Sequence, residues 1–138
     1  MASESSELDA RGHLDAATTL LDECAALGAL RDPGAAVRPG WLITAAFYAS
    51  LHAISGYVLA RHGVQVVAHR DRAEWFRSFP ELAQERFPFT SLKKQSEAFR
   101  YYAAAYTWDE AERSLAAAQR IVAKWSDRAR KALTPTGG

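Results

Sequence analysis

An uncharged run at residues 41–60 constrains the fold of this chain more than any other feature. A run of about 18 apolar residues is long enough to cross a membrane. This run is only moderately apolar, because it also carries Thr44, Ser50, His52 and Ser55. The segments on either side of it are amphipathic and offer apolar faces to cover it. We therefore expect a buried central helix rather than a membrane span.

The chain has 138 residues, which is enough for one domain with a single core. We expect one domain over 1–138, with flexible ends at about 1–4 and 134–138. Cys24 is the single cysteine and lies on an apolar stripe, so it is expected to be a small core residue without a disulfide. The polar, acidic start differs from a signal peptide, and together these features predict a cytoplasmic protein.

Apolar residues at three- and four-residue steps predict four long helices. Gly63 is a C-terminal stop for the second helix, and Thr107 with Glu110 forms the capping-box pattern at the start of the last one. A cap at Thr90 or Ser91 is expected to start the third helix. The predicted helices cover 4–30, 41–62, about 90–106, and about 107–133.

The connection at 63–90 has the least regular pattern. Residues 64–67 are expected to form a packed loop, and a short helix is expected at 71–79, ended by Pro80. Pro88 predicts a further boundary, because a proline disfavours helical geometry at Phe87. The predicted fold is therefore all-α: an antiparallel four-helix bundle with a short additional helix between helices two and three.

The sequence contains no pattern typical of a metal site or of a self-sufficient catalytic centre. Its four histidines (His13, His52, His62 and His69) include no pair at a spacing of four residues, and the single cysteine has no partner. There is no Gly-rich phosphate loop and no nucleophile elbow. We therefore expect no metal and no cofactor.

His52 stands out because Tyr48, one turn earlier, and Ser55 lie on the same face of the central helix. Two interpretations remain open. It is either a core histidine bonded to a neighbouring helix, or a residue that lines a ligand-binding or catalytic pocket.

Basic residues interleaved with aromatic residues form the second candidate site. The run His69-Arg70-Asp71-Arg72 is suited to phosphate contact, although it also fits a solvated helix start. A wider patch adds Lys93, Lys94, Arg100 and Arg77, flanked by Trp75, Tyr101 and Trp108. Such a surface suits single-stranded nucleic acid, and equally a protein interface.

The order of these parts resembles the HEPN superfamily of small helical bundles. The resemblance lies in the acidic first helix, the run from Trp41 to His52, Gly63-Val64, the His69–Arg72 cluster, Ser96-Glu-Ala-Phe-Arg-Tyr-Tyr102 and the Asp109-Glu-Ala-Glu start of the last helix. It implies RNA or nucleotide binding, a homodimer, and a place in a toxin–antitoxin or defence system. It also implies a nucleotidyltransferase-type protein as a candidate partner.

Active members of that family resemble one another in an Arg followed, after about four to six residues, by a His that handles the proton while Arg stabilises phosphate charge. This chain departs from the pattern, since Arg100 is followed at that distance by Ala105, Tyr106 and Thr107. We therefore expect a non-catalytic binding module, with Arg70, Arg72, Lys93, Lys94, Arg100 and Tyr48 as ligand-binding residues. The alternative is a metal-independent RNase that uses His69 or His52 with Arg70 or Arg100.

Overall fold

The computed structural model describes residues 4–29, 38–65 and 69–134, with the side chains of 4–6 and 69–73 left outside the description. The described part is all-α and contains no strand, as the sequence predicts. The predicted flexible ends lie almost wholly outside it. The elements are α1 (Glu4–Ala29), α2 (Pro39–His62), α3 (His69–Ser78), the 3-10 helix η1 (Pro80–Glu85), α4 (Arg86–Tyr102) and α5 (Trp108–Leu133).

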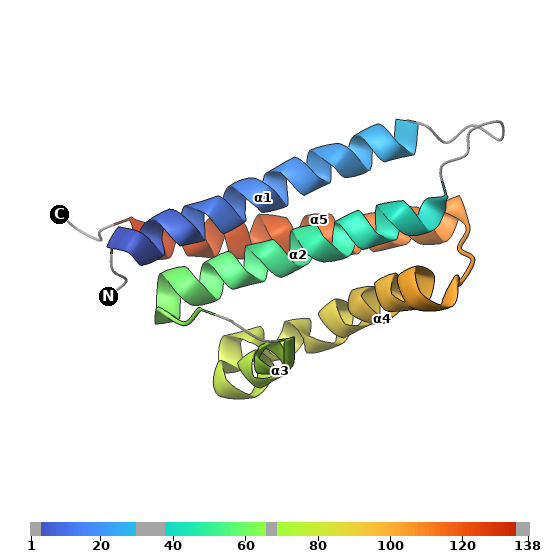
Figure 1. Ribbon diagram of the computed structural model, residues 1–138. Coiled ribbons are helices and arrows are strands. Elements are labelled where there is room, and N and C mark those ends of the chain that lie inside the picture. The colour runs from blue at the N-terminus through green and yellow to red at the C-terminus, as the bar shows by residue number, and fades with distance from the viewer. Residues whose placement is uncertain (1–3, 30–37, 66–68, 135–138) are drawn as a thin grey trace.

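Helix α2 is the centre of this helical bundle. It packs against α1, α4 and α5, and α1 also contacts α5 (Figure 1). Within the described residues, α2 alone has the length and composition of a membrane span, but 83% of its most apolar 18-residue window is buried inside the protein. Packing against three other helices explains why most of the surface of α2 is apolar, although Tyr48 and His52 are only half-buried on one side of it. The prediction of a buried central helix is confirmed, whereas cytoplasmic location stays a prediction.

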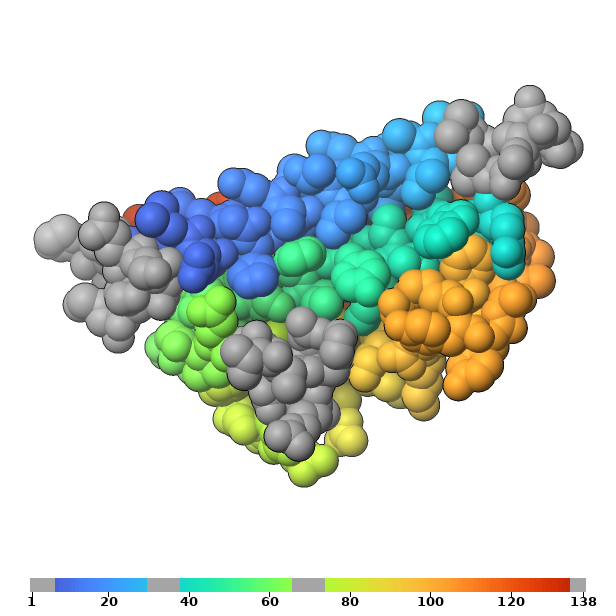
Figure 2. Space-filling model, viewed as in Figure 1, coloured from blue at the N-terminus to red at the C-terminus, as the bar shows by residue number. Residues whose placement is uncertain are grey.

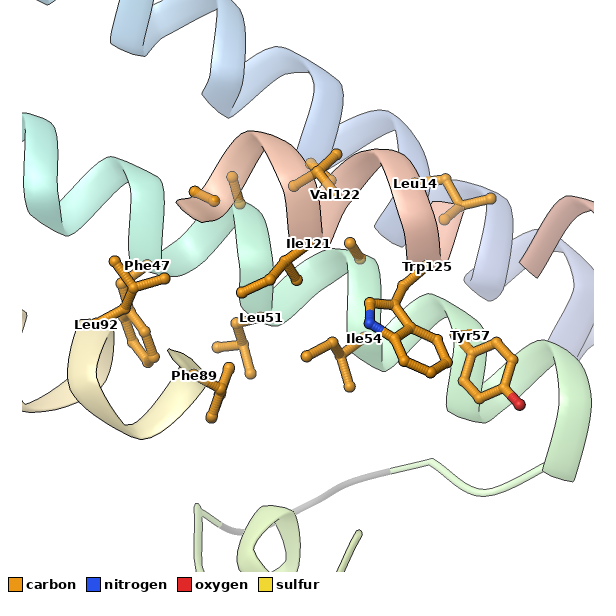
Figure 3. Close-up of a cluster of buried hydrophobic side chains, with 14 of the residues drawn as sticks. Leu14, Phe47, Leu51, Ile54, Tyr57, Phe89, Leu92, Ile121, Val122 and Trp125 are labelled. Carbon is orange, nitrogen blue, oxygen red and sulfur yellow. The ribbon is translucent and has the colours of Figure 1, made fainter. Parts of the chain in front are cut away.

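The core forms where α2 meets α1, α4 and α5. Trp125 of α5 is fully buried, and its ring centroid lies 4.7 Å from that of Tyr57 on α2. Figure 3 shows Leu51 and Ile54 of α2 in the same cluster as Ile121 of α5. Cys24 is also buried, as predicted, and burial raises the pKa of its thiol to about 11, with the charge of Glu23 adding to the effect.

The sequence predicts several helix ends correctly. Gly63 ends α2 in the left-handed conformation, with φ at 68°, and its N–H donates to the Leu59 carbonyl. Thr107 caps α5, and both reciprocal bonds with Glu110 are present at 3.1 Å. Both helix caps depend only on residues close together in the sequence, so they can be predicted from the sequence alone.

Three predictions about the 63–107 region are wrong. Helix α4 begins at Arg86 rather than near Thr90, because Pro88 lies within its first turn, where proline is tolerated. It also ends earlier than predicted: Ala103 adopts a left-handed conformation with φ at 54°, so Tyr106 lies beyond the helix. Val64 is 42% exposed rather than packed, and residues 66 and 67 of the same predicted loop lie outside the described residues.

Candidate functional site

Arg100, in the last turn of α4, is held by three hydroxyl groups. Its Nε donates a hydrogen bond to Ser96 Oγ at 3.0 Å, and its Nη1 donates to the hydroxyls of Tyr48 at 3.1 Å and Tyr101 at 3.2 Å. The guanidinium carbon also lies 4.9 Å from the centroid of the Tyr101 ring, within cation–π range. These contacts fix the direction in which the guanidinium points.

No carboxylate neutralises Arg100 within the described residues. Its Nη2 has no hydrogen-bond acceptor there either. The buried Ser96 that supports Nε donates in turn to Thr44 Oγ1 at 3.3 Å, which anchors the arrangement on α2. A guanidinium that is held in one orientation, with the N–H groups of Nη2 still available, is suited to bind an anion, and above all phosphate oxygens.

A row of polar side chains continues from Arg100 along α2. Tyr48 and His52 are four residues apart, so they share one helix face, and both are half-buried. His52 Nδ1 lies 2.9 Å from His13 Nδ1 on α1, and the two ring centroids are 5.2 Å apart. Because a hydrogen bond between two ring nitrogens needs one of them as an acceptor, at least one imidazole is neutral in this contact.

Gly56 sets the approach of α1 to α2 beside this pair. A Cβ at position 56 would lie 3.1 Å from the Leu14 side chain and 3.2 Å from both the Ala10 carbonyl oxygen and His13 Cβ. Only a residue without a side chain fits there without movement of α1. The close approach therefore brings His13 next to the turn of α2 that carries His52.

Aromatic side chains are exposed around the Arg100 end of the bundle. Tyr101 is 68% exposed, Tyr102 83% and Trp41 52%. The Trp41 ring meets Phe99 edge-on at 5.0 Å, and the Arg38 guanidinium lies 4.6 Å from the same Phe99 ring. Figure 2 shows the start of α2 (teal) adjoining the end of α4 (orange) on one face of the molecule. We call Arg38, Trp41, Arg100, Tyr101 and Tyr102 the aromatic–arginine surface.

The structure brings together only some of the residues predicted from sequence. Tyr48 and Arg100 are in direct contact, with His52 one turn away, whereas the side chains of His69, Arg70 and Arg72 lie outside the described residues. Lys94 is exposed, and Lys93 Nζ is 3.9 Å from Glu97 Oε1.

The aromatic flank of the predicted patch differs from the expectation. Trp75 is only 3% exposed, so it cannot offer its ring to a base, and Trp108 is half-buried. Arg77 Nη1 is 3.5 Å from Glu74 Oε1 on the same short helix. Sequence reasoning also missed His13, Arg38 and Trp41. The Arg38-Pro39-Gly40 run marks only a helix boundary in the sequence, and nothing local pairs His13 with a residue 39 positions away.

A second ionisable cluster lies where α2 ends. His62 Nε2 is 2.8 Å from Glu81 Oε1, and its ring stacks on Phe79 at a centroid distance of 3.9 Å. Burial raises the pKa of Glu81, but hydrogen bonds from His62 and from the backbone outweigh this, so its pKa lies below the usual value. These contacts attach η1 to the end of α2 and give the cluster a structural role.

No group of three or more metal-ligating side chains occurs among the residues that the structure describes. Compared with protein-family models, curated proteins and solved structures, the chain matches none of them. The assignment of a function therefore depends on the geometry of the site and on the motif resemblance.

Proposed function

We propose that this chain is a non-catalytic, HEPN-like antiparallel four-helix bundle that binds single-stranded RNA through the aromatic–arginine surface. The main support for this proposal is that Arg100 is held by hydroxyl groups and has no carboxylate partner in the described part of the chain. Arg100 is placed to contact a phosphate, and the exposed rings of Tyr101, Tyr102 and Trp41 are available for base stacking. A cytoplasmic location and a role beside a nucleotidyltransferase-type partner belong to the same proposal.

The test is fluorescence anisotropy with a labelled oligouridine of eight nucleotides at several salt concentrations. Affinity falls as salt rises, because phosphate contacts release counterions. Loss of a hydrogen bond to a charged group costs about 1.5–3 kcal/mol, so Arg100→Ala raises Kd by roughly 10- to 150-fold.

The matched control is Arg130→Ala, which removes the same charge from an exposed position in the last turn of α5. Its Kd stays within about twofold of wild type, since a distant surface charge contributes only a screened, long-range term. Thermal unfolding of each variant establishes that it is folded. Absence of RNA binding by the wild type at low salt, or equal losses in both variants, rejects the proposal.

A second candidate function, metal-independent RNA cleavage, is favoured by one specific observation. The His13–His52 pair lies one helical turn from Tyr48, which contacts Arg100. A neutral imidazole would take the proton of a 2′-hydroxyl as its oxygen attacks the adjacent phosphorus. A protonated imidazole would give a proton to the departing 5′-oxygen, leaving a 2′,3′-cyclic phosphate and a 5′-hydroxyl.

Cleavage of this kind persists in EDTA and follows a bell-shaped pH profile. His13→Ala and His52→Ala would each abolish it while leaving RNA binding at Arg100 in place. If the wild-type protein binds RNA but does not cut it over several hours, the binding module is the correct description and the catalytic alternative is rejected.

A further inference from the structure

One strip of α2 is left uncovered by the neighbouring helices. From residue 40 to residue 60 every residue is buried except Trp41, Ala45, Tyr48 and His52. These four residues follow one another at steps of four, three and four, so they lie in line on one face of the helix, and we call them the α2 strip. Figure 2 shows side chains of α2 at the surface between α1 (blue) and α4 (orange). At a rise of about 1.5 Å per residue, the α2 strip is about 16 Å long.

The residue types of the α2 strip suit a nucleobase. Trp41 and Tyr48 each supply an aromatic ring, and bases stack on such rings whatever their sequence. Ala45 lies between them along the helix and has only a methyl group, so no side chain of α2 fills the space between the two rings. A flat ring that lies over Ala45 is therefore within reach of both.

The charges on the α4 side of the strip select a polyanion. Arg100 Nη1 donates to the Tyr48 hydroxyl at 3.1 Å, so the guanidinium lies directly against the strip. Glu97, one turn before Arg100, has its carboxylate 3.9 Å from Lys93 Nζ. Within the described residues this pairing leaves Arg100 as the unbalanced charge at this edge. The positive edge complements a phosphate backbone.

The other end of the strip reaches α1. His52, its last residue, contacts His13 Nδ1 at 2.9 Å. Ala16 and Leu20 follow His13 at steps of three and four residues, so these half-buried, uncharged side chains continue along the same side of α1. A strand that lies along the strip therefore meets hydrogen-bonding groups at both ends, the guanidinium at one and the imidazoles at the other.

We propose that single-stranded RNA lies lengthwise along the α2 strip, with a phosphate on Arg100, a base over Ala45 and the next nucleotides directed towards the His13–His52 pair. This inference rests on the proposed RNA binding. It adds the path of the strand and names Ala45 as the residue whose small size admits the base. A strand held by the aromatic–arginine surface alone would leave Ala45 uncovered.

Filling the strip tests the path without changing any charge. Ala45→Leu places a larger side chain between Trp41 and Tyr48, so the Kd for labelled octauridine rises by roughly 5- to 150-fold, the loss expected for one stacked base. The matched control is Ala123→Leu, the same change at an exposed position of α5, and its Kd stays within about twofold of wild type. Thermal unfolding establishes that both variants are folded.

Thiol protection locates the strand in a protein whose strip is not blocked. Cys24 is buried, so Ala45→Cys introduces the more accessible of two thiols. Octauridine at ten times its Kd slows alkylation of this new thiol by roughly tenfold, because only the unbound protein reacts. The thiol of Ala123→Cys reacts at the same rate with and without RNA.

The outcomes separate this inference from the function on which it rests. If Arg100→Ala weakens RNA binding but Ala45→Leu does not, or if the thiol of Ala45→Cys stays reactive with RNA bound, the strand takes another path. Either result overturns the inference and leaves the proposed function in place. A wild-type protein that does not bind octauridine at low salt rejects both.

Discussion

Glu85 provides the most demanding test of how the bundle is held together. Its side chain is 1% exposed, and its carboxylate accepts hydrogen bonds from Arg120 at 2.8 and 3.1 Å and from Trp125 Nε1 at 2.6 Å. Lys124 Nζ lies 3.9 Å away. These contacts connect the end of η1, where α4 begins, to the middle of α5.

Glu85→Ala removes the partner of a buried indole N–H and of a guanidinium. Breaking a buried ion pair costs about 3–5 kcal/mol, and an unsatisfied buried N–H about 1–3 kcal/mol. Because the Arg120 side chain is 49% exposed, water can hydrate its guanidinium in the variant. The expected loss of stability therefore lies at the lower end of the range of about 3–5 kcal/mol for a buried ion pair. We expect a loss of about 3 kcal/mol at pH 7, or roughly 10 °C in Tm for a chain of this size.

The assay is urea denaturation followed by circular dichroism, with Asp127→Ala as the matched control. Asp127 pairs with Lys131 at 3.0 Å, but both side chains are well exposed, so its loss changes stability by about 0.5 kcal/mol or less. A Glu85→Ala protein within about 1 kcal/mol of wild type would refute the reasoning.

The pH dependence gives a second check on Glu85. Burial raises its pKa, but hydrogen bonds from Arg120 and Trp125 more than offset this, so the pKa in the folded state lies below the ordinary 4.5. The carboxylate's contribution is therefore complete above about pH 4.5 and is lost as pH falls through the folded-state pKa. The difference in free energy of unfolding between wild type and Glu85→Ala therefore narrows over that acidic range. A difference that stays constant with pH would show that the charge of Glu85 is not what stabilises the fold.

Three further predictions concern single positions. Gly40→Ala places a Cβ in steric overlap with the Phe99 ring, so we expect the free energy of unfolding in urea to fall by about 1–3 kcal/mol and RNA binding at the adjoining surface to weaken. Thr107→Ala removes the cap of α5 and costs about 1 kcal/mol, whereas Thr107→Ser retains most of it. The Cys24 thiol, with a pKa of about 11, reacts with a thiol reagent at pH 8 only at the rate of unfolding, so rapid labelling of the folded protein would contradict its burial.

The sequence predicts those parts of the fold that depend on neighbouring residues. Gly63, which follows a basic helix end, is correctly predicted to end α2. The Thr-x-x-Glu pattern at Thr107 is correctly predicted to start α5. The end of α4 is missed, because alanine has no preference for the left-handed conformation that Ala103 adopts. Pro88 is misread, because proline marks a boundary but also fits a first turn.

The candidate site is less predictable, since it consists of pairs distant in sequence. Tyr48 and Arg100 are 52 residues apart, and His13 and His52 are 39 apart. The residue types suggested phosphate chemistry, but only the packing of α1 and α4 on α2 determines which of them meet. Exposure is equally invisible in the sequence, where Trp75 and Trp41 look alike although one is buried and the other is half exposed.

The covering of α2 by three helices has a consequence for motion. Solvent reaches the fully buried turn around Ile54 only when a covering helix detaches, so the amide hydrogens of that turn are expected to exchange with deuterium at the slowest rates in the described part of the chain. Amides near Ile54 would then report the opening of the entire bundle, whereas those of Arg38 and Trp41 would report local fraying at the aromatic–arginine surface.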